Sequence, residues 1–229
     1  MILTLIYSPA TVRVYMSTAM IIIAILLALT MSYQKAAQVK PKFSIIEKAA
    51  LRPSIVIFFI TMTYGAVVAF IALYSTQQGI ANIGAFFTVY AIALSLARPV
   101  CGILSDRIGY NYVVLPGIVA IGAAMVTLSI AESLPYFLAA GVLYGIGFGA
   151  TQPALMALAV RNTPPQRRGL ANSTFFTGFD LGIGISAVMW GAISSITGYS
   201  TMYLLAVIPA GAALLSYLLL GTSKDSASS

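Results

Sequence analysis

Five polar side chains interrupt long apolar stretches of this sequence, where a polar group needs a reason to be present. Asp180 lies among glycine and aliphatic residues, and Tyr64, Tyr90, Tyr144 and Gln152 lie in comparable surroundings. A carboxyl group can bind and release a proton, whereas phenol and amide groups can hydrogen-bond to a ligand. These five residues are therefore candidates for a substrate or proton pathway.

Each candidate also has a purely structural interpretation. Asp180 can hydrogen-bond to Ser, Thr or Asn on a neighbouring helix, and the tyrosines can be ordinary packing residues. Gln152 can repair the backbone next to Pro153, because a proline frees a carbonyl group. Burial favours the uncharged form of a carboxyl group, which suits cyclic proton binding at Asp180.

Other chemistries lack the residues that they require. The sequence has no histidine, which excludes histidine-ligated haem, histidine-containing zinc sites and Ser-His-Asp triads. Its single cysteine, Cys101, cannot form an intrachain disulfide. We therefore expect no enzyme activity, no cofactor and no metal site, and the apolar composition also argues against a nucleic-acid partner.

The composition identifies the elements that carry these side chains. Of 229 residues, 60% are apolar and 7% are charged, whereas a soluble domain carries about 25% charged residues. Helices that cross a bilayer need about 20 mostly apolar residues. The sequence predicts an all-α integral membrane protein with seven transmembrane helices, at 14–32, 54–76, 80–104, 112–131, 135–160, 170–197 and 201–221.

The distribution of Lys and Arg predicts the topology. Eleven of the 12 basic residues fall in alternate gaps or at the same helix ends, and Arg13 alone falls on the other side. Basic loops stay cytoplasmic, so we expect a multi-pass plasma-membrane protein with its N-terminus outside. The expected parts are an extracytoplasmic segment with the first helix, a cytoplasmic basic linker, a six-helix bundle and a cytoplasmic tail, at 1–33, 34–53, 54–221 and 222–229.

Smaller features suggest packing or capping. Glycines spaced four residues apart let membrane helices approach closely, and we expect this role for Gly141, Gly145, Gly149, Gly178 and Gly182. In the linker, Ser44 and Glu47 match capping-box spacing. Glu132 lies in a short outer loop and is expected to be solvated.

One loop carries a motif with wider meaning. Between the third and fourth spans, Gly102, Asp106, Arg107 and Gly109 form the pattern G-x-x-x-D-R-x-G. It resembles the cytoplasmic loop motif of the major facilitator superfamily, although its trailing basic residues are replaced here. We expect nearby Arg98 to snorkel or to pair with Asp106 rather than to bind substrate.

The resemblance extends over nearly the whole chain after the first residues of span one. The segments 162–175 and 179–184 look like the loop between helices ten and eleven, and like helix eleven, of efflux-type members. The resemblance implies that the last six spans are helices seven to twelve, a half-bundle built as a 3+3 inverted repeat. It also implies that helices one to five are missing from this chain.

The resemblance implies a function and leaves alternatives open. The implied function is secondary active efflux of a small molecule by alternating access, with proton exchange as in an antiporter. Rocking needs a second bundle, which would be the N-terminal half or a second copy. The alternatives are a truncated remnant without independent transport and the permease subunit of an ATP-driven transporter.

Overall fold

The computed structural model describes residues 9–30, 45–161 and 163–221, and helices dominate these residues without any strand among them. The expected tail at 222–229 and the linker residues 34–44 lie outside the described residues. The chain divides into two units, Met1–Lys42 and Phe43–Ser229.

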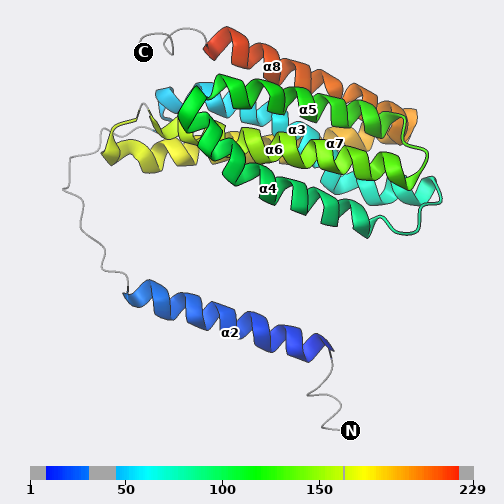
Figure 1. Ribbon diagram of the computed structural model, residues 1–229, viewed down its shortest axis with the longest axis horizontal. Coiled ribbons are helices and arrows are strands. Elements are labelled where there is room, and N and C mark those ends of the chain that lie inside the picture. The colour runs from blue at the N-terminus through cyan, green and yellow to red at the C-terminus, as the bar shows by residue number, and fades with distance from the viewer. Residues whose placement is uncertain (1–8, 31–44, 162, 222–229) are drawn as a thin grey trace. The chain divides into compact units, whose positions relative to one another are not determined.

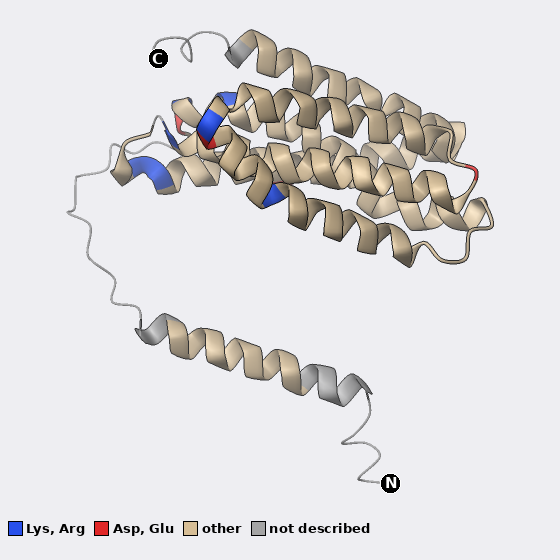
Figure 2. Cartoon of the chain, in the orientation of Figure 1, with Lys and Arg blue, Asp and Glu red and all other residues tan. Residues whose placement is uncertain are grey.

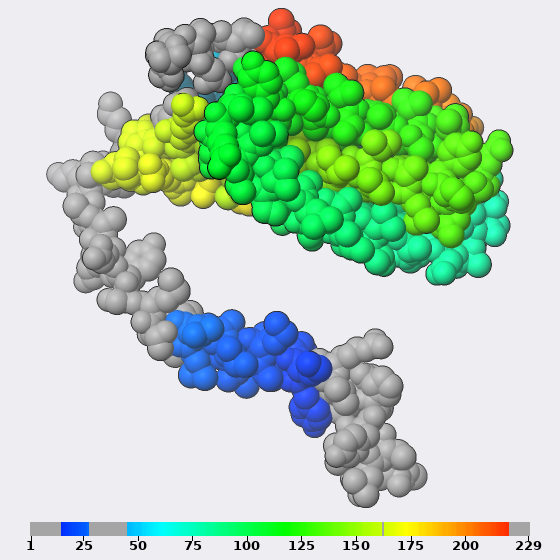
Figure 3. Space-filling model, in the orientation of Figure 1, coloured from blue at the N-terminus to red at the C-terminus, as the bar shows by residue number. Residues whose placement is uncertain are grey.

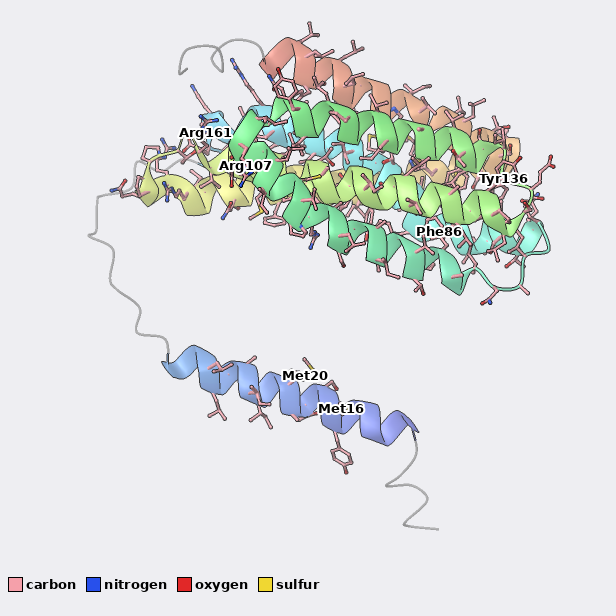
Figure 4. The ribbon with its side chains drawn as sticks, in the orientation of Figure 1. Met16, Met20, Phe86, Arg107, Tyr136 and Arg161 are labelled. Carbon is pink, nitrogen blue, oxygen red and sulfur yellow. The ribbon has the colours of Figure 1, made fainter. Side chains whose placement is uncertain are left out.

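The first unit contains one helix, α2, at Pro9–Thr30, which overlaps the predicted first span. All its described side chains, from Tyr15 to Leu27, are exposed. Met16 and Met20, labelled in Figure 4, are 65% and 71% exposed. The helix is therefore apolar without a protein core of its own.

The second unit is a bundle whose long helices run side by side (Figure 1). Its helices are α3 (Lys48–Gln77), α4 (Gly84–Ile108), α5 (Asn111–Ser129), α6 (Leu134–Arg161), the 3-10 helix η1 (Pro165–Arg167), α7 (Arg168–Leu205) and α8 (Val207–Gly221). Five described stretches are long and apolar enough to cross a membrane, and the last of them, Pro165–Leu219, contains both α7 and α8. The predicted all-α membrane fold is confirmed.

A turn within α7 separates the last two predicted spans. Gly198 has a φ of 81° and interrupts the helical backbone of α7. A positive φ favours glycine, because a side chain would clash in this conformation. The predicted spans 170–197 and 201–221 therefore lie on either side of this residue.

The start of α3 differs from the expected one, because the helix begins at Lys48 and includes Pro53. The backbone N–H of Glu47 donates to Thr174 Oγ1 at 3.0 Å, and the Glu47 carboxylate lies 2.9 Å from Arg167 Nε. A capping box with Ser44 needs Glu47 at the third helical position, whereas α3 begins after Glu47, so this interpretation is wrong; Ser44 itself lies outside the described residues. An ion pair to the segment before α7 fixes this helix end instead.

Two pairs of parallel helices organise the bundle. The most extensive packing of α3 is with α7, and the most extensive packing of α4 is with α6. In chain order, α3–α5 form one set of three helices and α6–α8 form another. The first helix of each set packs on the second helix of the other set, as two equivalent repeats would.

Glycines let α6 approach the backbone of α4. A Cβ atom on Gly145 would lie 2.7 Å from the carbonyl oxygen of Tyr90 and 2.8 Å from Ala93 Cβ. A Cβ atom on Gly149 would lie 3.0 Å from the carbonyl oxygen of Leu94. Real Cβ atoms essentially never lie as close as those at Gly145 would, and the contact at Gly149 would be tight, so the glycines set the separation of α4 and α6.

The same arrangement recurs between α7 and α3. A Cβ atom on Gly178 would lie 2.6 Å from the carbonyl oxygen of Ser54, and one on Gly182 would overlap Phe58 and Thr61. Gly141 likewise lies against α4, where its Cβ atom would be 3.2 Å from a ring carbon of Phe86. These glycines lie at the contacts between the paired helices.

The outer surface differs from the paired faces. On the face in Figure 3, side chains of α4, α5 and α6 cover the bundle along its length. A groove of about 490 Å³ runs between α4 and α6 and is lined by apolar side chains, including Leu96, Val142 and Ile146, together with Cys101. Such a lining suits a surface that faces hydrocarbon.

Most of the charged residues of the described bundle lie at one end of it (Figure 2). Arg107 and Arg161 lie at this end, whereas Phe86 and Tyr136 lie towards the other (Figure 4). The described basic residues within the first or last two turns of their helices, or in η1, are Lys48, Arg52, Arg107, Arg161, Arg167 and Arg168. Glu132 is exposed in the loop between α5 and α6.

The glycine contacts predict a position-dependent effect on stability. Gly145→Val forces α4 and α6 apart, and we expect it to destabilise the fold by about 1–3 kcal/mol, which is typical of overpacking. Gly184→Val is the matched control, because a Cβ atom there meets nothing within 4 Å. Thermal unfolding in detergent measures both variants. Equal losses of stability would contradict close packing at Gly145.

Candidate functional site

Three of the five candidate residues come together around one phenylalanine. The rings of Tyr90 and Tyr144 have centroids 6.0 Å apart, and Tyr144 is 6.0 Å from Phe148. Phe148 stacks on Tyr64 at 5.0 Å and meets the edge of Phe179 at 6.3 Å. These five side chains form the aromatic cluster, which draws on α3, α4, α6 and α7.

The tyrosines of this cluster differ in what they can offer to a ligand. Tyr144 is fully buried, and its hydroxyl shares a hydrogen bond of 2.9 Å with Thr63 Oγ1. Tyr64 and Tyr90 are only half-buried. Tyr144 therefore holds α6 to α3, while the other two phenols remain partly accessible.

Gln152 hydrogen-bonds to Arg98, for which the sequence predicts a different partner. Arg98 Nη2 donates a hydrogen bond of 3.0 Å to Gln152 Oε1, and Arg98 is exposed. The expected pairing of Arg98 with Asp106 is wrong, because eight residues of helix separate them by about 12 Å. The parallel register of α4 and α6 brings Gln152 beside Arg98, as it brings Tyr144 beside Tyr90.

Asp180 lies apart from this contact, on the side of α7 that faces away from α3. Gly178 and Gly182 pack against α3, and a residue two positions from each lies about 200° around the helix. Asp180 is exposed, and within the described residues it has neither a hydrogen bond nor an ion pair. Its neighbour in sequence, Phe179, belongs to the aromatic cluster.

Arg98 and Asp180 are the two charged residues that lie deep in the described bundle. Arg98 lies 10 residues before the end of α4, and Asp180 lies 12 residues after the start of α7. At 1.5 Å per residue these depths are about 15 and 18 Å from the basic end, close to the middle of a bilayer core about 30 Å thick. A charge at this depth costs about 2.5–3.5 kcal/mol on insertion scales, which favours contact with water or a ligand.

The loop motif lies at the basic end and forms a tight turn. Gly109 has a φ of 99°, and its N–H donates to the carbonyl oxygen of Ser105 at 3.1 Å. Asp106 lines a polar groove of about 440 Å³ together with Arg161, whose guanidinium lies 5.7 Å from the centre of the Tyr110 ring.

The two remaining motif residues lie beside this turn. Gly102 has open space around its Cβ position, and Arg107 is exposed. The motif residues therefore shape the connection between α4 and α5, away from the aromatic cluster.

Two members of this region and one contact outside it were not predicted from the sequence. Phe148 lies midway between Tyr144 and Gln152 at four-residue spacing, and this periodicity was the available signal. Phe179 precedes Asp180 directly. The pairing of Glu47 with Arg167 spans 120 residues of sequence and had no local signal. Among the described residues, no group of three or more Cys, Asp or Glu side chains is placed to hold a metal.

Curated proteins from two other organisms are similar in sequence to part of this chain. A relative from Methanocaldococcus jannaschii, an uncharacterized MFS-type transporter named MJ1560, is 29% identical over 62% of this chain and 37% of its own length. The staphylopine export protein of Staphylococcus aureus is 28% identical over 69% of this chain and 41% of its length. The chain therefore spans about two fifths of the length of these curated relatives.

Solved structures and a family profile agree with these relatives. A POT family transporter in complex with a thioalcohol conjugated peptide superposes with a TM-score of 0.67 at 23% identity, over 76% of this chain and 38% of that one. This likeness shows a shared fold. The sequence profile of the Major Facilitator Superfamily matches residues 53–229. Together with the paired-helix bundle, this match shows that the chain belongs to the Major Facilitator Superfamily.

Proposed function

We propose that this chain is the C-terminal portion of a secondary active transporter that exports a small molecule in exchange for protons. Membership in the family supports membrane transport of small molecules. A named relative, the staphylopine export protein, supports the outward direction. Family membership also argues against the permease subunit of an ATP-driven transporter.

The proposed proton coupling rests on the surroundings of Asp180. Its carboxyl group lies deep in the bundle, is exposed and has no described partner. Such a group can take up a proton from water on one side and release it on the other. A structural aspartate would instead be held by hydrogen bonds from neighbouring helices, which the described residues do not provide.

The helix pairs support alternating access. The glycine faces of α6 and α7 present backbone to α4 and α3, so each pair can move as one rigid body. The proposed pathway consists of Tyr64, Tyr90, Gln152 and Asp180, with Tyr144 as its buried support. A second bundle, either an N-terminal half or a second copy, would close this pathway on its open side.

We also propose an orientation in the plasma membrane, with the basic end of the bundle cytoplasmic and the N-terminus outside. The described Lys and Arg residues near helix ends collect at one end of the bundle, and this asymmetry is the basis of the proposal (Figure 2).

The proposed coupling predicts the effect of Asp180→Asn. In proteoliposomes loaded with a neutral, a cationic or an anionic fluorescent dye, the unmodified chain should accelerate efflux of at least one dye when the outside is acidic. Asp180→Asn cannot ionise, so we expect at least a tenfold loss, roughly the contribution of a positioned proton-transfer group. Glu132→Gln is the control, because Glu132 lies in an exposed loop.

Two outcomes would contradict this proposal. If dye leaves vesicles that contain the unmodified chain no faster than it leaves protein-free vesicles, the chain would be a truncated remnant without independent transport. Equal pH-dependent efflux by the unmodified chain and Asp180→Asn would remove Asp180 from the coupling.

The orientation predicts which ends can be labelled from outside the cell. With Cys101 replaced by Ser, we expect Glu132→Cys to react with a membrane-impermeant maleimide in intact cells. Arg168→Cys should react only after the cells are permeabilised, since Arg168 begins α7 at the basic end. The reverse labelling pattern would show that the orientation is inverted.

A further inference from the structure

We infer that the pathway accepts a small aromatic molecule bearing a carboxylate, and that Arg98 binds the carboxylate. This inference rests on the proposed transport function and names the substrate class of the same pathway. It starts from the charge of Arg98, which the transport proposal does not use.

The described contacts of Arg98 leave its positive charge uncompensated. Its partner is the amide oxygen of Gln152, at 3.0 Å, and an amide carries no net charge. A guanidinium has five N–H donors, so donors remain for an incoming group. The planar fork of an arginine matches the two oxygens of a carboxylate.

The acidic residues of the described bundle do not supply the missing anion. Asp106 lies about 12 Å further along α4, at the basic end. Asp180 lies on α7, and α4 and α7 do not pack against each other. Among the described residues, the ion pair that forms joins Arg167 to Glu47, at the start of α3. No acidic side chain of the described bundle therefore supplies an anion at this depth, and an incoming carboxylate can do so.

The aromatic cluster supplies a surface for the rest of such a ligand. Phe148 precedes Gln152 by about one turn of α6, so the two residues lie about 6 Å apart along the helix axis. Gln152 is the residue that contacts Arg98. The half-buried Tyr64 stacks on Phe148, and the half-buried Tyr90 contacts Tyr144. A planar arene can lie against these rings in stacked or edge-to-face contact while its carboxylate reaches the guanidinium.

The sign of the charge at Arg98 also determines which molecules are rejected. A cationic aromatic amine would meet an uncompensated positive charge, which repels it. A neutral analogue would leave that charge without a counter-ion. The site therefore favours anionic over neutral and cationic ligands, and ligands of all three kinds can place an aromatic ring against the cluster.

Three probes with one ring system test the inference. The purified full chain in lipid nanodiscs is titrated with 2-naphthoate, 2-naphthamide and 2-naphthylmethylammonium by calorimetry. We expect 2-naphthoate to bind at least about tenfold more tightly than 2-naphthamide, as a charge-assisted hydrogen bond provides. Arg98→Gln should abolish this preference, Arg98→Lys should restore part of it, and Arg168→Gln should leave it unchanged.

A second variant tests the inference independently of whether Arg98→Gln folds. Gln152→Glu keeps Arg98 and places a carboxylate within 3 Å of it, on the side chain that already accepts its hydrogen bond. We expect this internal ion pair to retain the thermal stability of the chain and to abolish the preference for 2-naphthoate. Equal affinity for the three probes, no binding of 2-naphthoate, or a preference that survives in Arg98→Gln or Gln152→Glu would overturn the inference.

The binding experiment separates this inference from the transport proposal. Binding requires no flux, so an Arg98-dependent preference for 2-naphthoate stands even where Asp180→Asn leaves efflux unchanged, which overturns only the proton coupling. Conversely, efflux that depends on Asp180 together with equal affinities for the probes overturns only the anion site.

Discussion

The bilayer interior requires each polar group to be satisfied within the protein or to face water, and the bundle follows this requirement closely. Hydroxyl groups donate to carbonyl oxygens of the preceding turn, as Thr151 does to Gly147 at 2.9 Å. The Trp190 indole donates to the carbonyl oxygen of Met62 at 2.9 Å. Against this background Arg98 and Asp180 stand out, because one has only a neutral partner and the other has none among the described residues.

The glycine faces determine where these two charges lie. Because α6 packs on α4 and α7 packs on α3 in parallel, Arg98 and Asp180 reach similar depths on helices that do not contact each other. The aromatic cluster draws on all four of these helices and links α4, through Tyr90, to α7, through Phe179. The packing therefore separates the charge of Arg98 from the carboxyl group of Asp180, as the proposed anion site and the proposed proton coupling require.

Much of the fold was predictable, because apolar length and glycine spacing are local properties of the sequence. The turn at Gly198 and the role of the loop motif in a tight connection followed from the same signals. The start of α3 was not predictable, since it depends on Glu47 meeting Arg167 across the fold. For the site, the residues were predictable but their partners were not. Arg98 hydrogen-bonds to Gln152 rather than pairing with Asp106 because of the register between α4 and α6, which the sequence does not show.

The proposed pathway requires the deep charges to face water rather than lipid. Spin labels placed singly at positions 98, 180 and 146 in lipid bilayers measure this directly, through their accessibility to a water-soluble nickel complex relative to oxygen. We expect labels at 98 and 180 to favour the nickel complex, and a label at position 146, in the apolar groove, to favour oxygen. A label at 180 that favours oxygen as strongly as the one at 146 would contradict the proposed pathway.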